Sequence, residues 1–312
     1  MKSYITIDGG TTNTRVNLVR DRKIIKAIQI SAGAKKGIED RGYLKKELKK
    51  AIDSVVQNYH DPIEKILASG MITSGLGLYN LPHLPVPVGI EELHNGMCEV
   101  VLSEITEIPF VFIPGVKIPG GSLAGTDMMR GEETELIGMA EKLHSECLYV
   151  LPGSHSKLIR TDRQGRISDF VTTLTGEMIA ALSKGTILKD AVDLSQAEFE
   201  DEYLTQGYCY CRKMGINEAL FKIRILNNVL HATPGQVYSF FMGSILQAEI
   251  KEIIRSKEKI VILGGKRQIK IGMVKLLNHF CDKKVISVPD ATVVAAPAVG
   301  AIKIYEYNRR EV

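Results

Sequence analysis

The feature that most constrains the fold of this chain is the polar turn that follows its first strand-like segment. Residues 3–7 and 15–19 have the β-branched, alternating character of strands, whereas residues 8–13 read Asp-Gly-Gly-Thr-Thr-Asn, which is turn chemistry. A third strand-like segment follows at 24–30. The sequence therefore predicts an opening strand meander. It disfavours a Rossmann dinucleotide site, because no helix N-terminus follows the turn.

The same pattern returns in the second half of the chain. Residues 147–151 form a strand-like segment, the turn Pro-Gly-Ser-His follows at 152–155, and further strands are expected at 157–160 and 168–173. A later buried strand at 260–263 ends in a pair of glycines. Two strand-turn-strand units, each with a glycine and hydroxyls at its first turn, predict a duplicated α/β architecture.

Helical periodicity is expected in five other regions. These regions are 44–56, 132–144, 177–252, 273–280 and 291–305; over 44–56 apolar residues recur at helical spacing with lysines between them, and 291–305 consists largely of small residues.

A glycine-rich segment at 119–126 predicts the boundary between two domains, since so many glycines are unfavourable inside a helix or strand. On this basis residues 1–118 form an N-terminal domain. Residues 119–312 form a C-terminal domain. The C-terminal helix, 291–308, is expected to pack back on the first domain.

Composition excludes several classes of protein. The 312 residues are 45% apolar and 24% charged, which is typical of a globular protein and not of a disordered or collagen-like chain. The net charge of +4 gives no nucleic-acid footprint. Five cysteines form neither a disulfide framework nor a zinc pattern, and no signal peptide or 18-residue apolar run occurs. We therefore expect a cytoplasmic protein with reduced thiols and neither membrane nor nucleic-acid partners.

The first turn is a candidate phosphate site. Asp8 closes the strand, and Gly10, Thr11, Thr12 and Asn13 present backbone N–H groups and hydroxyls that are suited to phosphate oxygens. The Asp8 carboxylate is suited to Mg²⁺, which it would hold through water. No Walker phosphate loop occurs in the chain. An ordinary hairpin turn is the alternative.

Two later turns have related chemistry. Gly153, Ser154 and His155 offer free N–H groups, a hydroxyl and an imidazole, although a plain hairpin could have the same sequence. Gly264 and Gly265 end a buried strand before a helix, where a nucleotide base or ribose could lie against the backbone.

The order of these three turns resembles that in the superfamily of sugar kinases, actin and heat-shock chaperone ATPases. The resemblance implies an actin-like ATPase fold, in which two ribonuclease-H-like α/β domains enclose a nucleotide in an interdomain cleft. It also implies that residues 1–118 form the substrate side and residues 119–312 the nucleotide side. The small-residue segment 295–301 looks like the second connecting helix of that superfamily.

Within the superfamily, several motifs are similar to 2-keto-3-deoxygalactonate kinases. They lie at 129–138 (Met-Arg-Gly-Glu-Glu-Thr-Glu-Leu-Ile-Gly), 149–157, 169–170 and 175–177, with loops at 70–77 and 113–115. The chain departs from the family at Gly9, where relatives often carry Trp, and at Ser154, Ser156 and Leu158. Residues 191–212 do not align.

The resemblance implies ATP- and Mg²⁺-dependent phosphorylation of the 6-hydroxyl of 2-keto-3-deoxygalactonate, a step of galactonate degradation. Its general base would lie at the start of the helix after the Arg-Gly motif, so Glu132 is the first candidate and Asp127 the second. Charge at a helix N-terminus is the alternative reading of Glu132.

The sugar-acid carboxylate suits a planar guanidinium, which makes Arg15 and Arg130 the candidates, each with a surface ion pair as its alternative. Met71 and Ser74 lie in a family-like loop and are expected near the substrate.

Two other functions remain open at this stage. One is a kinase of the same fold that acts on another sugar or polyol. The other is a nucleotide-dependent regulator without a small-molecule acceptor, which is disfavoured because the sequence has no peptide-binding domain and no helix-turn-helix segment. A homodimer is compatible with the sequence, which determines neither the oligomeric state nor the galacto versus gluco preference.

Overall fold

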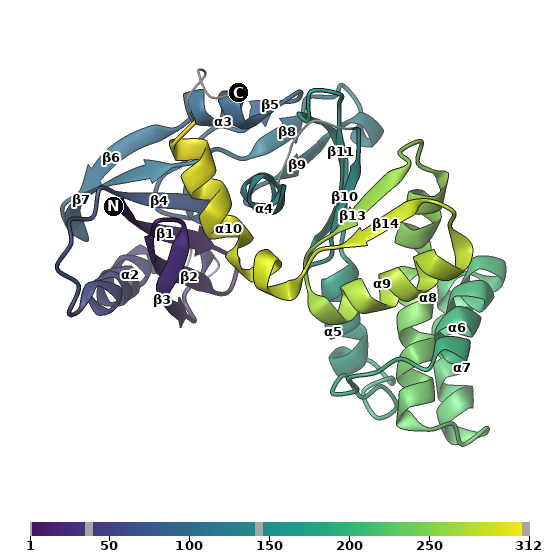
Figure 1. Cartoon of the computed structure of the whole chain (residues 1–312). Helices are drawn as coiled ribbons and strands as arrows, with labels where there is room; N and C mark the ends of the chain where they lie inside the picture. Colours follow the sequence, from purple (N-terminus) through teal and green to yellow (C-terminus); the bar gives the residue numbers. More distant parts are fainter. Residues whose placement is uncertain (1, 35–39, 141–145, 308–312) are drawn as a thin grey trace. The chain divides into compact units, whose positions relative to one another are not determined.

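A computed structural model gives the protein a mixed α/β architecture (Figure 1). It describes residues 2–34, 40–140 and 146–307. The predicted helix at 132–144 and the predicted C-terminal helix at 291–308 each extend in part outside the described residues. Contacts within the chain define two units. Unit 1 comprises residues 1–145, 161–170 and 291–312, and unit 2 comprises residues 146–160 and 171–290.

Unit 1 is built on a six-stranded sheet in the order β3-β2-β1-β4-β7-β6. Its strands are β1 (Ser3–Gly9), β2 (Thr14–Arg20), β3 (Lys23–Ile30), β4 (Lys65–Gly70), β6 (Cys98–Leu102) and β7 (Thr106–Phe112). The first three strands form an antiparallel meander, and β4 pairs in parallel with β1. The predicted opening meander is therefore confirmed.

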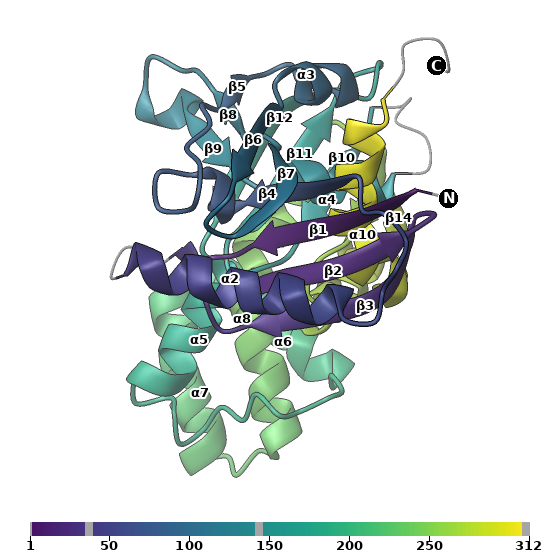
Figure 2. The same ribbon diagram turned by 90° about the vertical axis from the view of Figure 1, so that its left-hand side faces the viewer.

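Helices cover both faces of this sheet (Figure 2). Helix α2 (Arg41–Val56) packs on one face through Leu44, Leu48 and Ile52, which are fully buried among the side chains of β1, β2 and β4. Asp40 begins the helix by accepting a hydrogen bond from the backbone N–H of Tyr43. Helices α4 (Glu132–Met139) and α10 (Asp290–Tyr305) lie on the other face.

The glycine-rich segment at 119–126 lies inside unit 1. It joins β8 (Val116–Ile118) to β9 (Asp127–Met129), which pair antiparallel in a small sheet with β5 (Leu84–Pro85). The short helices of unit 1 are η1 (Met71–Thr73), α3 (Ile90–Asn95) and η2 (Leu123–Gly125). Because the strands on either side of the glycines pair with each other, contacts place the division of the chain after residue 145 instead of after residue 118. The assignment of substrate and nucleotide roles to 1–118 and 119–312 stays a prediction.

The second sheet has the order β12-β11-β10-β13-β14. Its strands are β10 (Leu148–Leu151), β11 (Ser156–Thr161), β12 (Ile167–Thr173), β13 (Ile260–Leu263) and β14 (Lys284–Ser287). Strand β10 pairs antiparallel with β11 and parallel with β13, just as β1 pairs with β2 and β4. The predicted duplication of a ribonuclease-H-like sheet is confirmed.

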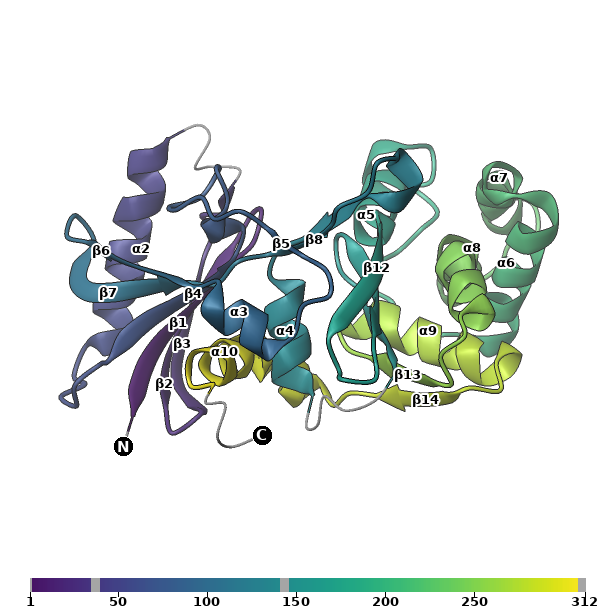
Figure 3. The ribbon, with the colours of Figure 1, turned by 90° about the horizontal axis from the view of Figure 1, so that it is seen from above.

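Unit 2 also contains several long helices (Figure 3). They are α5 (Thr175–Gly185), α6 (Asp201–Met214), α7 (Ile216–Asn228), α8 (Pro234–Arg255) and α9 (Arg267–Phe280). Helix α8 is buried along most of its length, and Thr233 and Gln236 form a capping box at its start. Residues 186–200 are turns and not helix, because side chains such as Asp193 bond nearby backbone N–H groups there. No helix in the described part of the chain is both long and apolar enough to cross a bilayer.

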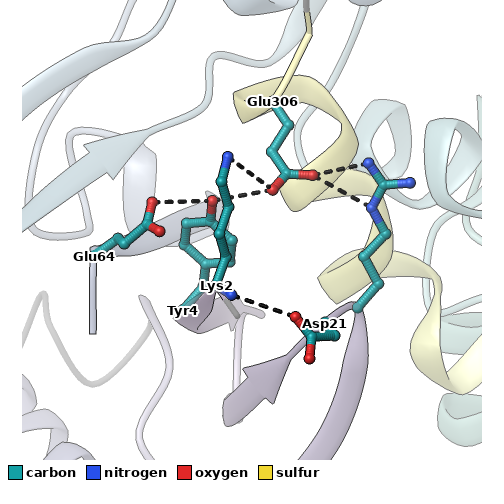
Figure 4. A network of polar contacts seen from close by, with 6 residues as sticks. Lys2, Tyr4, Asp21, Glu64 and Glu306 are labelled. Atoms are coloured by element: carbon teal, nitrogen blue, oxygen red, sulfur yellow. Dashed lines mark hydrogen bonds and ion pairs between the residues drawn. The ribbon is translucent and has the colours of Figure 1, made fainter. Parts of the chain in front are cut away.

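Hydrogen bonds and an ion pair hold the residue that follows α10 against the start of β1 and the β2–β3 turn. Glu306 accepts hydrogen bonds from the hydroxyl of Tyr4 at 3.1 Å and from Nη2 of Arg22 at 2.8 Å, and lies 3.6 Å from Nζ of Lys2 (Figure 4). Arg22 and its neighbour Asp21 have φ values of 63° and 48° in the tight β2–β3 turn. A pocket of about 270 Å³ is lined by the residues of this network, Lys2, Tyr4, Asp21, Arg22 and Glu306. Their contacts anchor the helix.

Candidate active site

In unit 1 the candidate site begins where β1 ends. Asp8 is the penultimate residue of β1 and lies directly across from Arg15 of β2 in the antiparallel ladder. On the other side it neighbours Ser69 at the end of β4. The side chains of Asp8 and Arg15 are half-buried. The sheet register thus brings the predicted metal ligand and one predicted carboxylate-binding guanidinium together.

Gly131 brings helix α4 to the same place. It has a φ of +112°, which disfavours any other residue, and a Cβ added to it would lie 3.1 Å from the Cα of Gly70. Helix α4 therefore starts against the end of β4, next to the end of β1. Glu132, the first residue of the helix, lies close enough to Asp8 for the two charges to interact.

The carboxyl groups around the end of β1 raise one another's pKa values. Burial raises the pKa of Asp8; the charge of Arg15 lowers it, and that of Glu132 raises it further. Burial also raises the pKa of Glu135 to about 8, with further upward contributions from Asp8 and Glu132 that Arg15 partly offsets. Glu133 likewise has a pKa of about 8 because it is buried beside Glu132. The cluster has an excess of negative charge, which suits a bound cation.

The structure treats the two candidate bases differently. Glu132 is half-buried beside Asp8, and its Oε2 accepts a hydrogen bond from the backbone N–H of Arg130 at 3.0 Å. Asp127 lies in β9, where its Oδ1 accepts a bond from the N–H of Met128 at 2.7 Å. Glu132 is therefore the carboxylate that the structure brings to Asp8.

Arg130 fastens two loops of unit 1. Its Nη1 donates to the carbonyl oxygen and hydroxyl of Thr73 at 2.7 and 2.6 Å, and its Nη2 donates to the carbonyl of Leu81 at 2.8 Å. Nη2 also lies 3.2 Å from Nδ1 of His83. Burial, Arg130 and Lys117 lower the pKa of His83 to about 4, so its neutral ring can accept this bond. These bonds occupy both terminal nitrogens of Arg130, which leaves Arg15 better suited to bind a substrate carboxylate.

The loop that Arg130 holds contains the other predicted substrate residues. Met71 begins the turn η1, directly after Gly70 at the end of β4, and is half-buried. Ser74 follows this turn and donates its hydroxyl to the carbonyl of Met71 at 2.6 Å. The loop is therefore ordered by its own bonds next to the acidic cluster.

The first predicted phosphate turn, residues 10–13, is closed by a bond from the N–H of Gly10 to the carbonyl of Asn13 at 2.8 Å. Thr11, Thr12 and Asn13 are exposed. A hairpin turn of this kind is compatible both with phosphate binding and with a purely structural role.

In unit 2 the second and third predicted turns lie together. Gly264 donates its N–H to the carbonyl of Val150 at 2.9 Å, and Lys266 donates its N–H to that of Pro152 at 2.7 Å. Gly265 has a φ of +69°, and a Cβ there would lie 2.3 Å from the carbonyl oxygen of Pro152. Because β10 and β13 are parallel neighbours, the two glycine turns that end them form one surface.

Polar side chains surround this double turn. Nζ of Lys266 donates to the hydroxyl of Ser154 at 3.3 Å. Nε2 of His155 lies 2.9 Å from Oε1 of Glu177, which is in the first turn of α5. The backbone N–H of Glu177 donates to the carbonyl of Ser154 at 3.2 Å. Hydroxyl, imidazole and ammonium groups thus gather around Gly153, a combination that suits an anion.

Sequence reasoning missed three residues of these clusters. Glu135 follows Glu132 by three residues, a spacing that places both on one face of a helix and could have revealed it. Glu133 is buried by contacts that no local pattern shows, and Lys266 gains its place through the parallel pairing of β10 with β13. Within residues 2–34, 40–140 and 146–307, no three Asp, Glu, His or Cys residues are placed to ligate one metal ion.

Comparisons with known proteins show the family of this chain. The profile of the family described as 2-keto-3-deoxy-galactonokinase matches residues 8–296. The 2-dehydro-3-deoxygalactonokinase of Escherichia coli strain K12 is 27% identical over 271 residues, which cover 84% of this chain and 85% of that protein.

A solved structure from Sinorhizobium meliloti, described provisionally as a 2-dehydro-3-deoxygalactonokinase, superposes with a TM-score of 0.77. It is 20% identical and covers 98% of each chain, so it shows that the two proteins share a fold. Because the family profile spans nearly the whole chain, including Asp8, the Arg130–Gly131–Glu132 segment and both glycine turns of unit 2, this chain belongs to the 2-keto-3-deoxy-galactonokinase family.

Proposed function

We propose that this protein uses ATP to phosphorylate the 6-hydroxyl of 2-keto-3-deoxygalactonate. Membership of the kinase family supports the reaction class, and the name of the Escherichia coli relative supports the substrate. The observation that carries the proposal is the cluster at the end of β1, where Asp8, Arg15 and Glu132 meet. This cluster combines a cation-binding carboxylate, an anion-binding guanidinium and a second carboxylate that can accept a proton.

Asp8 would hold Mg²⁺. The fit rests on the two carboxyl groups of Asp8 and Glu132 beside the single guanidinium of Arg15. Burial raises the pKa of Asp8, and a divalent cation would favour its charged form. Mg²⁺ keeps several waters and needs only one or two protein carboxylates, so a dedicated cage of three ligands is not required. When bound, Mg²⁺ supplies charge neutralisation on the phosphate oxygens.

Glu132 would accept the proton of the attacking hydroxyl. It begins α4, and the backbone N–H of Arg130 holds its Oε2, so the carboxylate is oriented before substrate arrives. General-base catalysis needs a positioned carboxylate within hydrogen-bond reach of the hydroxyl. Asp127 is the alternative base, and whether its carboxylate can approach the hydroxyl depends on the position of the β8–β9 hairpin.

Arg15 would bind the carboxylate of the sugar acid. Its guanidinium can form a planar pair of hydrogen bonds with two carboxylate oxygens, and its position across the ladder from Asp8 supports a role in the same site. Met71 and Ser74 would line the same subsite from the loop that Arg130 orders.

Each unit offers its own candidate turns for a nucleotide. Gly10, Thr11, Thr12 and Asn13 in unit 1 offer N–H and hydroxyl donors to phosphate oxygens. In unit 2 the donors are Gly153, Ser154 and His155, with the ammonium of Lys266 beside them. Gly264 and Gly265 would lie against the adenosine, where the absence of side chains permits close approach.

Release of ADP from Mg-ATP tests this proposal. The purified protein is assayed with 2-keto-3-deoxygalactonate, its gluconate epimer, a panel of hexoses and polyols, and no acceptor. Strong stimulation by the galactonate compound alone is expected. Stimulation by a different acceptor would retain the kinase and replace the substrate, and release without any acceptor dependence would refute the proposal.

A further inference from the structure

Helix α8 carries a buried carboxylate directly beneath the second glycine turn. Glu249 is 2% exposed and lies in the middle of the helix. Its Oε1 accepts hydrogen bonds from the hydroxyls of Thr173 and of Thr175, the latter at 2.6 Å. The hydroxyl of Ser156 also lowers the pKa of this carboxyl group. Three hydroxyls therefore act on one side chain.

These hydroxyls belong to the segments that build the turn. Ser156 is the first residue of β11, immediately after His155, and its Oγ accepts a bond from the N–H of Gly153 at 3.3 Å. Thr173 ends β12, and Thr175 begins α5. Ser156 thus connects the two groups: it accepts a bond from the N–H of Gly153 and lowers the pKa of Glu249.

Helix α5 connects the same carboxylate to the turn by a second route. Thr175 is held by Glu249, and two residues later Glu177 donates its N–H to the carbonyl of Ser154 and pairs its side chain with His155. The two routes reach Gly153, Ser154 and His155 from opposite sides. A rigid, buried helix thereby sets where the donors of the turn point.

Burial of this carboxylate is costly. It raises the pKa of Glu249, although the three hydroxyls lower it in part. Its Oε2 is buried without a hydrogen-bond partner among the described residues. An apolar residue would fill the core of unit 2 without that cost, so a carboxylate here points to a task beyond packing.

We propose that Glu249 is a positioning residue for ATP, which orients the phosphate-binding turn 153–155 through Ser156 and Thr175. This inference rests on the proposed function, because it takes that turn to bind the nucleotide. Glu249 itself does not touch the substrate. Its Oε1 accepts bonds from the hydroxyls of Thr173 and Thr175, and an amide oxygen at this place would be a weaker acceptor than a carboxylate oxygen.

The test compares two isosteric variants on one helix. Glu249→Gln removes the charge beneath the turn, whereas the control Glu252→Gln removes one that pairs with Arg160 at 2.6 Å. Titration calorimetry measures the Kd for Mg-ATP without acceptor, and steady-state assays give KM for each substrate. For Glu249→Gln we expect Mg-ATP binding to weaken about tenfold, as loss of a hydrogen bond to a charged group predicts, with KM for the sugar acid within about twofold of the wild-type value. Glu252→Gln should change neither.

A second pair of variants guards against misfolding. Thr175→Val removes the hydroxyl that donates a hydrogen bond to Glu249, and Thr175→Ser keeps that hydroxyl. We expect Thr175→Val to weaken Mg-ATP binding and Thr175→Ser to leave it unchanged, with thermal unfolding checked for both. Unchanged Mg-ATP affinity in Glu249→Gln and Thr175→Val, or an equal loss for both substrates, overturns the positioning role. If the wild-type protein itself does not bind Mg-ATP, the proposed function fails and this inference fails with it.

Discussion

The two units contain sheets with the same strand pairing at their centre, but the chemistry at the ends of the central strands differs. In unit 1, Asp8 is the penultimate residue of β1 and faces Arg15 across the ladder, and Glu132 lies beside it. In unit 2, β10 ends with the buried Leu151, and the turn that follows carries hydroxyl and imidazole groups. Both units place their polar groups after strands that correspond in order, so the shared backbone fixes the place of a site and not its chemistry.

The difference teaches how one architecture can take two tasks. Carboxylates with raised pKa values in unit 1 suit a metal ion and a proton, whereas N–H, hydroxyl and ammonium groups in unit 2 suit phosphate. If this division is correct, substitutions in unit 1 should lower kcat, and substitutions in unit 2 should raise KM for ATP.

The largest expected effect is that of Asp8→Ala. Loss of the metal-binding carboxylate should lower kcat by about 10³-fold or more, since charge stabilisation at the transferring phosphate is the main source of catalysis. Steady-state ADP release measures it. Asp53→Ala is the control, because Asp53 is an exposed residue of α2 that pairs with Lys49 at 3.6 Å. Near-normal kcat in Asp8→Ala, with the fold intact by circular dichroism, would refute the metal role.

Glu132→Gln should have the next largest effect. Removal of a general base typically lowers kcat by on the order of 10²-fold or more, with little change in KM. Asp127→Asn is the matched comparison, and its kcat should stay within about twofold of wild type if Glu132 is the base. The reverse ranking of the two variants would pass the role of base to Asp127.

In unit 2 the expected effect is smaller and falls on a different parameter. Lys266 is exposed beside Ser154, so Lys266→Ala should raise KM for ATP about fivefold, in line with roughly 1 kcal/mol for an exposed charge contact. The KM for the sugar acid should not change. Lys257→Ala, at another exposed position of unit 2, serves as control. A rise in both KM values would break the proposed division of labour.

The smallest effect concerns stability. Because burial beside Glu132 raises the pKa of Glu133 from 4.5 to about 8, the folded protein holds this proton more tightly than the unfolded chain. Its contribution to stability is therefore complete below pH 4.5 and is lost as the pH rises to about 8. Glu133→Gln cannot ionise, so its Tm should fall less over this range, by roughly 2–4 °C for each kcal/mol involved. The exposed Glu107→Gln is the control. Equal slopes for Glu133→Gln and wild type would contradict this account.

The sequence predicts strands and turns of this chain better than the contacts between them. Local alternation and turn residues identify β1, β2 and β10 with their turns, because those signals lie within a few residues. The pairing of β8 with β9 across a glycine-rich segment depends on tertiary contacts and shifts the division of the chain. The strand β6 and the helix α3 were not expected from the sequence.

The same limit applies to the site. Asp8 and Glu132 follow from motifs, but their proximity depends on the contact of Gly131 with Gly70, residues that are far apart in the chain. Arg130 illustrates the opposite case. Its guanidinium suggests a substrate ligand, yet its partners Thr73 and Leu81 lie 57 and 49 residues away and can be identified only in the folded structure.

The most direct test of this division is calorimetric titration of Glu132→Gln and Lys266→Ala with each substrate separately. A non-hydrolysable ATP analogue with Mg²⁺ is one ligand, and 2-keto-3-deoxygalactonate is the other. We predict that Glu132→Gln binds both ligands as the wild type does while its turnover is lost, and that Lys266→Ala binds the sugar acid normally but the nucleotide more weakly. Normal nucleotide affinity in Lys266→Ala, together with normal turnover in Glu132→Gln, would contradict the account.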